Sequence, residues 1–434
     1  MTPLSVSHAP AEQASLAEWL LWLEARNPAR IDLGLDRVAN VWRKLKQEGN
    51  LVVPKVITVA GTNGKGSSVA LLEAILLAEG YRVGAYTSPH IERFNERIRL
   101  MGADIQDHEL VVAMRQLAAT DGSEALTYYE WATLAAFLAF CRANLDTWIL
   151  EVGLGGRLDA VNILDADLAL ITNIGLDHQA YLGNTRAQIG YEKAGVLRKG
   201  QAAVYADTDP IESVIDHANA IGCPLIVRGR DFMVEADATG WRLEQGDRSS
   251  YWPLPGMFGR TQVDNAAGVV ALLQHPKSTL SLLGSSIEAG VRSAKNRGRF
   301  EIWVHEGRRV ILDVAHNLES VRVLLDNLHA LSTPSRRLAV FGALDDKPIE
   351  AMISLCRPEF DEWYLGQLDS VRSASIARLS SALDRPQISE TSITSAYNAA
   401  FAHSAVGDQI IAFGSFYTVS AIRHVLSQSG AHLV

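Results

Sequence analysis

Short runs of β-branched and other apolar residues alternate with helical patterns from about residue 55 onward. The apolar runs predict strands over residues 55–61, 81–90, 147–156 and 166–175. Between the first two, the pattern SVALLEAILLAEG (68–80) predicts a helix that ends at Gly80. This alternation indicates βαβ units, and hence a parallel sheet with helices on both faces.

The alternation starts again after the polar and basic stretch RSAKNRGR, which ends at residue 299. Further strands are predicted over residues 309–317, leading into a helix, and over 337–344 and 409–422. We therefore expect an α/β protein with one domain over residues 1–297 and a second, smaller Rossmann-like α/β domain over 298–434. Residues 225–260 have a less regular pattern, in which WPLPGMFGR (252–260) predicts a loop.

Composition narrows the class of protein. The net charge of −9 argues against nucleic acid or an anionic membrane as the main partner, because both require a basic face. The longest apolar run, 131–140, is shorter than a membrane span and predicts a buried helix. The first residues have no basic stretch and no apolar core typical of a signal peptide. With only three widely spaced cysteines, we expect reduced thiols in a cytoplasmic protein: Cys141, Cys223 and Cys356.

A glycine-rich loop, AGTNGKGS (60–67), follows the first predicted strand. It departs from the common phosphate-loop pattern because Gly66 separates Lys65 from Ser67. The glycines allow backbone N–H groups to turn inward, the following helix adds its positive end, and Lys65 supplies a mobile cation. An ordinary strand-to-helix turn with a solvated lysine is the alternative. The combination favours phosphate binding.

Chemically useful side chains follow each of the next three strands as well. Ser88 follows the second strand, Glu151 ends the third, and Asp177 and His178 come after the fourth. Because ligands bind at the carboxyl ends of parallel strands, we expect these groups at one edge of the sheet. Ser88 and Glu151 suit Mg²⁺, whereas a histidine ligand suits Mn²⁺ or a mixed shell. Asp177 and His178 could equally be a helix cap and a surface histidine.

Other candidates are ambiguous on their own. The segment 151–160 is typical of a close-fitting ligand loop, or of a plain βα connection. Asp313 or Asn317 could simply cap a helix. Arg299 could be an ordinary linker arginine, but a cleft between two α/β domains is where a nucleotide and a second substrate would meet. These residues favour an ATP- and metal-dependent enzyme, and a kinase, an NTPase or a ligase would all satisfy them.

The order of the motifs provides a resemblance. The chain contains TVAGTNGKGSS, YTSPHIERFNERI, TYYEWAT, EVGLGGRLDAVNI, DHQAYLG, EKAGV, DVAHN and GSFYTV. In this order they resemble folylpolyglutamate synthases, and IDLGLDRV (31–38) resembles the bacterial bifunctional dihydrofolate synthase/folylpolyglutamate synthases. The resemblance extends from about residue 15 to 425. The Mur peptidoglycan ligases share the overall plan, so the resemblance implies a Mur-ligase-like, ATP-binding central domain with a phosphate loop.

The resemblance implies an amide ligase. ATP would phosphorylate the carboxylate of dihydropteroate, or of the terminal glutamate of a reduced folate, and the amine of L-glutamate would attack the acyl phosphate. ATP, two Mg²⁺ ions (or Mn²⁺) and these small molecules would be the only partners of a cytoplasmic monomer. A Mur-type amino-acid ligase and a regulatory protein that cycles ATP are the alternatives. Against the first, the chain carries IDLGLDRV where a separate N-terminal domain for a UDP sugar is expected.

The resemblance also implies roles for individual residues. Those on the ATP phosphates would be Thr62, Asn63, Gly64, Lys65, Gly66 and Ser67, with the nucleotide site completed by Asn265, Arg299 and Asp313. Metal ligands would be Ser88, Glu151 and His178. Lys193 matches the family's carbamylated lysine and would act in catalysis with Lys65 and His316. Of these, His316 is a candidate for the glutamate or phosphate side. Dihydropteroate would be held by Asp32, Leu33, Gly34, Thr127, Tyr128, Tyr129, Glu130, Leu158, Asp159 and Ala160.

Some positions depart from the family pattern. Thr261 replaces a histidine beside the expected adenine contacts. Other departures are RGRF at 297–300, AHNL at 315–318, DKP at 346–348 and DAVN at 159–162. None removes a candidate metal ligand or Lys65, so they bear on substrate detail and not on the reaction class.

Overall fold

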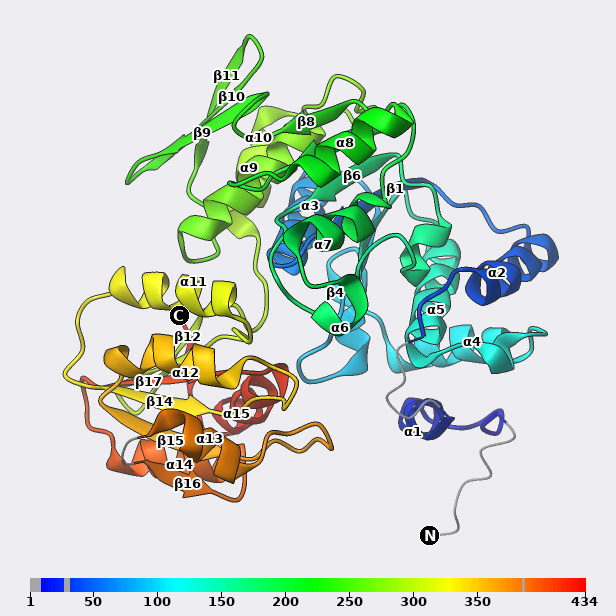
Figure 1. Ribbon diagram of the computed structural model, residues 1–434. Helices are drawn as coiled ribbons and strands as arrows, with labels where there is room; N and C mark the ends of the chain where they lie inside the picture. The colour runs from blue at the N-terminus through cyan, green and yellow to red at the C-terminus, as the bar shows by residue number, and fades with distance from the viewer. Residues whose placement is uncertain (1–8, 27–31, 385–386) are drawn as a thin grey trace. The chain divides into compact units, whose positions relative to one another are not determined.

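The computed structural model describes residues 9–26, 32–384 and 387–434 (Figure 1). The contacts divide the chain into two compact units. The first unit contains the described residues up to Ser88, together with Asn95–Gly256 and Val263–Lys295. The second unit contains Asn296–Val434 and two short segments from earlier in the chain, Pro89–Phe94 and Met257–Gln262.

The first unit is built on an eight-stranded sheet with the order β4-β3-β2-β5-β1-β6-β7-β8. Its strands are β1 (Lys55–Ala60), β2 (Val83–Tyr86), β3 (Ile98–Leu100), β4 (Ala103–Asp104), β5 (Thr147–Glu151), β6 (Leu168–Ile171), β7 (Ala202–Tyr205) and β8 (Leu225–Val227). All neighbouring pairs from β2 to β8 in this order are parallel, whereas the β2–β3 and β3–β4 pairs are antiparallel. The central strands are buried along almost their whole length because helices cover both faces. The predicted parallel-rich α/β fold is confirmed.

Helices precede, connect and follow these strands. They are α1 (Leu16–Arg26), α2 (Asp36–Gly49), α3 (Lys65–Glu79), α4 (Asp107–Ala118), α5 (Tyr128–Arg142), α6 (Gln179–Leu182), α7 (Arg186–Ala194), α8 (Glu212–Ile221), α9 (Arg260–Leu273) and α10 (Gly284–Ser293), with 3₁₀ turns η1 (Phe94–Arg97), η2 (Ser123–Ala125) and η3 (Ala160–Ile163). The predicted stop at Gly80 is confirmed: its φ is +95° and its N–H donates to the carbonyls of Leu76 and Leu77. The helix starts at Lys65, three residues before the predicted start at residue 68, so the loop lysine belongs to the first helical turn.

The apolar run 131–140 lies in α5, whose residues Glu130–Phe140 are all buried, as predicted. Within the described ranges, the chain contains no helix with the length and apolarity needed to cross a membrane.

The segment from residue 225 is more regular than its sequence pattern indicates. It forms a separate three-stranded antiparallel sheet of β9 (Phe232–Ala236), β10 (Gly240–Gln245) and β11 (Arg248–Pro253). One face is held by Trp241 and Trp252, which are cross-strand partners and both buried. The polar residues on the other face hide the strand pattern. The loop predicted over 252–260 is therefore wrong at its start, because β11 runs to Pro253.

The second unit contains a seven-stranded mixed sheet with the order β16-β15-β14-β17-β13-β12-β18. Its elements are β12 (Glu301–His305), β13 (Arg308–Leu312), α11 (Leu318–His329), β14 (Arg337–Phe341), α12 (Ile349–Cys356), η4 (Arg357–Glu359), β15 (Glu362–Gly366), α13 (Ile376–Leu383), β16 (Ile388–Glu390), α14 (Ile393–His403), β17 (Gln409–Phe413), α15 (Phe416–Gln428) and β18 (His432–Leu433). Alternate residues of β13 enter different cores: Ile311 packs with α11 and α12, whereas Val310 and Leu312 pack with α14 and α15. Helices therefore cover both faces of this sheet.

The strand predicted over 409–422 is wrong in its second half. β17 ends at Phe413, Gly414 adopts φ +107°, and Ser415 caps a new helix by accepting a hydrogen bond from the Tyr417 N–H at 3.1 Å. The apolar residues after Ser415 suit a strand or a buried helix equally well. Gly414 ends the strand, and the cap at Ser415 starts the helix.

Candidate active site

The glycine-rich loop joins β1 to α3, and two of its glycines are sterically required. Gly61 and Gly64 adopt φ values of +146° and +83°. A Cβ atom on Gly61 would overlap the hydroxyl of Thr172, and one on Gly64 would overlap the side-chain oxygen of Asn265. The loop therefore packs against the residue that follows β6 and against α9. The N-terminus of α3 provides a positive helix end of the kind that binds phosphate.

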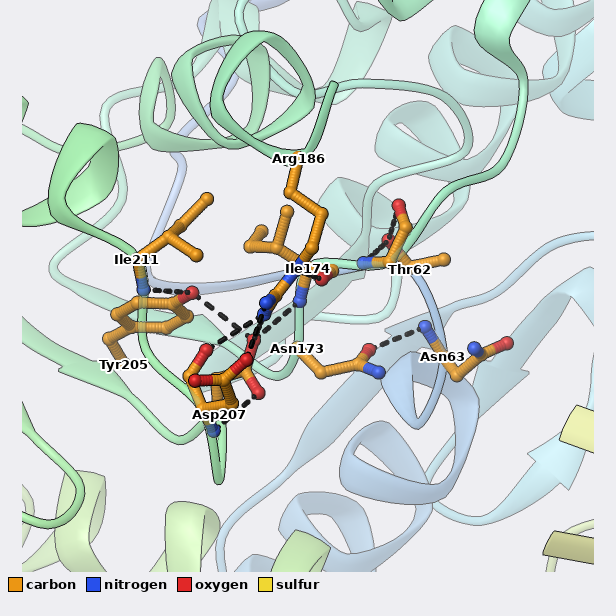
Figure 2. Close-up of polar contacts among 10 residues, drawn as sticks. Thr62, Asn63, Asn173, Ile174, Arg186, Tyr205, Asp207 and Ile211 are labelled. Carbon is orange, nitrogen blue, oxygen red and sulfur yellow. Dashed lines mark hydrogen bonds and ion pairs between the residues drawn. The ribbon is translucent and has the colours of Figure 1, made fainter. Parts of the chain in front are cut away.

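The segment after β6 holds this loop in place (Figure 2). The N–H groups of Thr62 and Asn63 donate to the main-chain and side-chain oxygens of Asn173, at 2.8 and 2.7 Å. The Gly175 N–H donates to the Thr62 hydroxyl at 2.9 Å. The main-chain N–H groups of Thr62 and Asn63 are thus engaged within the protein. Asn173 is absent from the sequence-based candidates, although its place directly after β6, at the same sheet edge, is a signal that could have found it.

Two lysines converge on one carbonyl of the loop. Lys65 Nζ donates to the carbonyl oxygens of Gly61 and Thr62 at 3.0 and 3.1 Å, and Lys193 Nζ donates to that of Gly61 at 2.8 Å. Lys193 is buried. Burial, followed by the nearby charge of Lys65, lowers the pKa of Lys193 to about 7. A substantial part of this amine is therefore neutral near pH 7, which makes it a nucleophile.

The carboxyl end of α7 places Lys193 beside the loop. The Arg157 N–H donates to the carbonyl of Glu192 at 2.7 Å, and the two side chains form an ion pair. A Cβ on Gly156 would lie 2.9 Å from the Glu192 carbonyl oxygen, so the glycines of the segment 151–160 permit this close contact. The segment therefore packs against the helix that carries Lys193.

Two of the three candidate metal ligands lie together. The Ser88 N–H donates to Glu151 Oε2 at 3.2 Å, across the neighbouring ends of β2 and β5, and Glu151 is buried. His178 follows β6 on the other side of β1, adopts φ +50° at the start of α6 and is exposed. Its N–H donates to Asp177 Oδ1 at 2.8 Å.

Among the described residues, no three His, Cys, Asp or Glu side chains cluster closely enough to hold a metal ion. A metal at Ser88 and Glu151 would therefore depend on hydroxyl, phosphate and water oxygens for most of its ligands. That donor set fits Mg²⁺, which usually keeps several waters and binds substrate phosphates.

Two of the predicted substrate segments meet at Asp159. Its carboxylate accepts hydrogen bonds from the N–H groups of Gly153, Leu154 and Val161 at 2.9 to 3.0 Å, and from the Tyr129 hydroxyl at 3.2 Å. Burial raises the pKa of Asp159 to about 6, and these hydrogen bonds oppose the shift. The carboxylate thus organises the loop that follows β5. Leu158 and Ala160 flank it.

A third segment joins through an arginine that is missing from the candidates. Arg37 donates to Glu130 Oε2 at 2.8 Å and to Asp32 Oδ2 at 2.9 Å. Glu130 also forms a capping box with Thr127 at the start of α5. Arg37 lies inside the motif IDLGLDRV, which could have pointed to it; Ile31, the first residue of that motif, lies outside the described residues.

The remaining candidates of the first unit have simple positions. Leu33 and Gly34 lie between Asp32 and α2, and Tyr128 begins α5, with the Arg97 guanidinium carbon 5.9 Å from its ring centroid. Gly66 and the buried Ser67 lie in the first turn of α3.

The candidates of the second unit gather around Asp313. Its buried carboxylate accepts from the N–H groups of Phe300 and Ala315 at 2.9 and 2.8 Å. Burial raises the pKa of Asp313 to about 6, against the opposing charge of Arg299. Phe416, at the start of α15, has the Arg299 guanidinium 5.7 Å from its ring centroid. Phe416, which contacts two of the candidates, lies in the motif GSFYTV but is absent from the sequence-based candidates.

His316 lies beside the ring of Phe416 as well. Its ring centroid is 5.9 Å from that of Phe416, and its Nδ1 donates to the Val314 carbonyl at 2.7 Å. That bond places a proton on Nδ1 and so fixes the orientation of the ring. Of the two residues that the sequence offers as a helix cap, Asp313 and Asn317, it is Asn317 that caps α11. Its side chain accepts from the Ser320 N–H at 2.9 Å.

Two family models and several known proteins match most of this chain. The Mur ligase middle domain matches residues 59–273, and the Mur ligase glutamate ligase domain matches residues 298–416. A protein of Escherichia coli strain K12 named dihydrofolate synthase/folylpolyglutamate synthase is 38% identical over 423 residues, 97% of this chain and 98% of the relative. A protein of Bacillus subtilis strain 168 with the same name is 32% identical over 76% of this chain and 80% of the relative.

Solved structures agree in fold. That of E. coli FolC in complex with DHPP and ADP has a TM-score of 0.89 and 38% identity, and the match covers 96% of this chain and 99% of FolC. A bifunctional folylpolyglutamate synthase/dihydrofolate synthase with Mn, AMPPNP and L-glutamate bound has a TM-score of 0.87 and 39% identity, over 97% of this chain and 99% of that one. The resemblance found in the sequence is confirmed: this chain belongs to the dihydrofolate synthase/folylpolyglutamate synthase family and carries its two Mur ligase domains.

Proposed function

We propose that this chain is an ATP-dependent ligase that adds L-glutamate to dihydropteroate and to the terminal glutamate of reduced folates. The observation that carries the proposal is the convergence of Lys65 and Lys193 on the Gly61 carbonyl, in a phosphate loop that shares its sheet edge with Ser88 and Glu151. A cationic loop beside oxygen ligands suits the activation of a carboxylate by phosphoryl transfer. Relatives that carry both activities in their names are similar over nearly the whole chain.

In this reaction a substrate carboxylate attacks the γ-phosphorus of ATP, ADP leaves, and the resulting acyl phosphate is attacked by the amine of L-glutamate. Inorganic phosphate leaves as the amide forms. Lys65 and the N-terminus of α3 would neutralise the charge on the phosphates. Bound Mg²⁺ or Mn²⁺, held in part by Ser88, Glu151 and His178, would supply further positive charge.

Lys193 has the properties that carbamylation requires. A buried lysine with a pKa of about 7 is partly neutral and can add CO₂. The product is an anion, so the repulsion between Lys65 and Lys193 would become an attraction. The carbamate oxygens would be suited to a second divalent ion, as in the family pattern.

The substrate side rests on the three segments joined by Asp159, Tyr129 and Arg37. Their groups form a polar frame at the end of β5, which we assign to dihydropteroate. Arg299, Asp313 and His316 in the second unit would serve the nucleotide and the glutamate or phosphate, and Asn265, beside Gly64, would serve the nucleotide. We further infer that the domains are 1–297 and 298–434, and that the protein is a cytoplasmic monomer.

Phosphate release provides the test. Release should be slow with ATP alone and should require dihydropteroate and L-glutamate together, with a glutamyl amide found by mass spectrometry. Tetrahydrofolate, offered separately, tests the second activity. Release that does not depend on glutamate, with no amide product, would instead indicate an ATP-cycling protein and would overturn the proposal. Light scattering after gel filtration gives the molar mass in solution and so tests whether the protein is a monomer.

A further inference from the structure

The short segment 173–175 faces in two directions (Figure 2). Asn173 and Gly175 bind the phosphate loop, as described above, whereas Ile174 between them does not. The Ile174 N–H donates to Asp207 Oδ2 at 2.8 Å, and its carbonyl accepts from Arg186 Nε at 2.7 Å. Ile174 is only 2% exposed, so both main-chain groups depend on partners within the protein. Two charged side chains therefore hold the centre of the segment that holds the loop.

Asp207 follows β7, the strand next to β6, and is 5% exposed. Its Oδ2 also accepts from the Tyr205 hydroxyl at 3.2 Å and from Arg186 Nη2 at 3.4 Å, and its Oδ1 accepts from the Asp209 N–H at 3.1 Å. Burial raises the pKa of Tyr205, so its hydroxyl keeps the proton that it donates. The carboxylate is thus fixed from several sides and presents one oxygen to Ile174.

Arg186 adds a connection to the helix that carries Lys193. It is the first residue of α7, and Lys193 lies near the end of the same helix. Its Nη1 and Nη2 also donate to the side-chain and main-chain oxygens of Asp209, at 2.5 and 2.7 Å. The guanidinium therefore joins three parts of the first unit: the start of α7, the turn after β7 and the segment beside the phosphate loop.

We propose that Arg186 and Asp207 are positioning residues for nucleotide binding. They hold Ile174 so that Asn173 and Gly175 keep Thr62, Asn63 and the rest of the phosphate loop in the geometry that accepts the phosphates of an adenine nucleotide. The identity of the nucleotide rests on the proposed function, whereas the contacts do not. A role limited to folding would change stability and leave nucleotide affinity intact.

The affinity for ADP, measured by isothermal titration calorimetry, tests this role. Asp207→Ala and Arg186→Ala should each weaken ADP binding by roughly tenfold, because coupled networks of this kind carry such interaction energies. Asp207→Asn keeps an oxygen for the Ile174 N–H and should lose less; it also serves as the second variant if Asp207→Ala does not fold. The KM values for L-glutamate and dihydropteroate should stay unchanged.

Asp408 in the second unit provides a matched control. It is 2% exposed, pairs with Arg336 Nη2 at 2.7 Å and accepts from the Ala405 N–H at 2.9 Å, but it precedes β17 and so lies at the opposite end of its sheet from Asp313. Asp408→Ala should lower the melting temperature as Asp207→Ala does. It should leave ADP affinity within about twofold of the wild type.

Hydrogen exchange gives an independent readout. Amide exchange across residues 61–66 should accelerate in Asp207→Ala and not in Asp408→Ala. Unchanged ADP affinity in folded Asp207 and Arg186 variants would overturn the proposal, as would an equal loss in Asp408→Ala. If the wild type binds ADP but makes no glutamyl amide, the proposed function fails while these affinities still decide the positioning role. A wild type that does not bind ADP overturns both.

Discussion

Lys193 donates a hydrogen bond to the main-chain carbonyl of Gly61 at 2.8 Å, although the two residues are 132 positions apart in the chain. The same carbonyl accepts from Lys65. Two cations on one neutral acceptor are an unfavourable arrangement, which is relieved if one of them becomes an anion or if phosphate binds beside them. The contact links the lysine of α7 to the phosphate loop and is the basis of the first prediction.

Replacing Lys193 with Ala should abolish ligation, with a fall in kcat of at least about a hundredfold, because the carbamate that would help to hold the second metal is lost. A short carboxylic acid added to the buffer should restore part of the rate. Lys193→Arg, which keeps the charge but cannot form the carbamate, is the matched variant and should be equally inactive.

Carbamylation can also be observed directly. Wild-type protein incubated with ¹³C-bicarbonate should give a carbamate signal by NMR that is missing from Lys193→Ala. Full activity in Lys193→Ala would show that this lysine has no catalytic role.

Gly64→Ala should weaken ADP binding and lower the free energy of unfolding by more than the roughly 1–2 kcal/mol expected for a left-handed residue alone. The excess arises because the added Cβ overlaps the side-chain oxygen of Asn265. Gly80→Ala is the control: φ is +95° there, but nothing lies within 4 Å of the added Cβ. Denaturant unfolding and calorimetric titration with ADP measure both variants. If the two lose equal unfolding free energy and equal ADP affinity, Gly64 needs only its backbone conformation.

Glu151→Gln should reduce the rate by at least tenfold and raise the Mg²⁺ concentration needed for half-maximal activity, because a carboxylate ligand is replaced by a neutral amide. The amide oxygen can still accept from the Ser88 N–H, so the fold should persist. Glu73, a second buried carboxylate, pairs with Arg99 at 2.7 Å and provides the comparison. Glu73→Gln should change the free energy of unfolding but not the Mg²⁺ dependence of the rate. A normal rate in Glu151→Gln would exclude Glu151 as a metal ligand.

Asp313 should titrate near pH 6, because burial raises the pKa of its carboxyl from 3.8 to about 6. The native state then binds more protons than the unfolded state between those values, so the contribution of Asp313 to the free energy of unfolding falls as the pH rises from about 4 to about 6. Arg299→Ala removes a nearby positive charge and should raise the pKa of Asp313 further.

Carboxyl ¹³C NMR measures this titration. Asp237 is an internal reference: hydrogen bonds from Thr239 lower the pKa of Asp237 to about 2, and Arg299→Ala should leave it there. A titration of Asp313 that does not respond to Arg299→Ala would mean that the two charges do not interact.

The sheet edge could be predicted from the sequence because it depends only on strand order and direction. Parallel strands bring their carboxyl ends together, so Lys65, Ser88 and Glu151 were expected to share one edge, and they do. The α/β fold could be predicted for a related reason, because strands that alternate with helices form parallel sheets. The resemblance then supplied roles that neither spacing nor periodicity indicates, such as that of Lys193.

Other features could not be read from local patterns. Asn173 lies at the predicted sheet edge, and Arg37 and Phe416 lie inside motifs of the sequence. Their contact partners are distant in the chain, and neither the sheet edge nor the motifs indicate which residues they contact. The sheet of β9 to β11 is polar on its exposed face, which hides its alternation. After β17, a glycine and a serine cap end the strand within a run that is apolar throughout.

The transfer of ¹⁸O tests the central claim most directly. Dihydropteroate labelled with ¹⁸O in its carboxylate is incubated with the protein, ATP, Mg²⁺ and L-glutamate, and the inorganic phosphate is analysed by mass spectrometry. An acyl phosphate predicts that one ¹⁸O atom appears in each phosphate released, with the other retained in the amide carbonyl. Phosphate that is released without the label would contradict the account, because the carboxylate would then not have been phosphorylated.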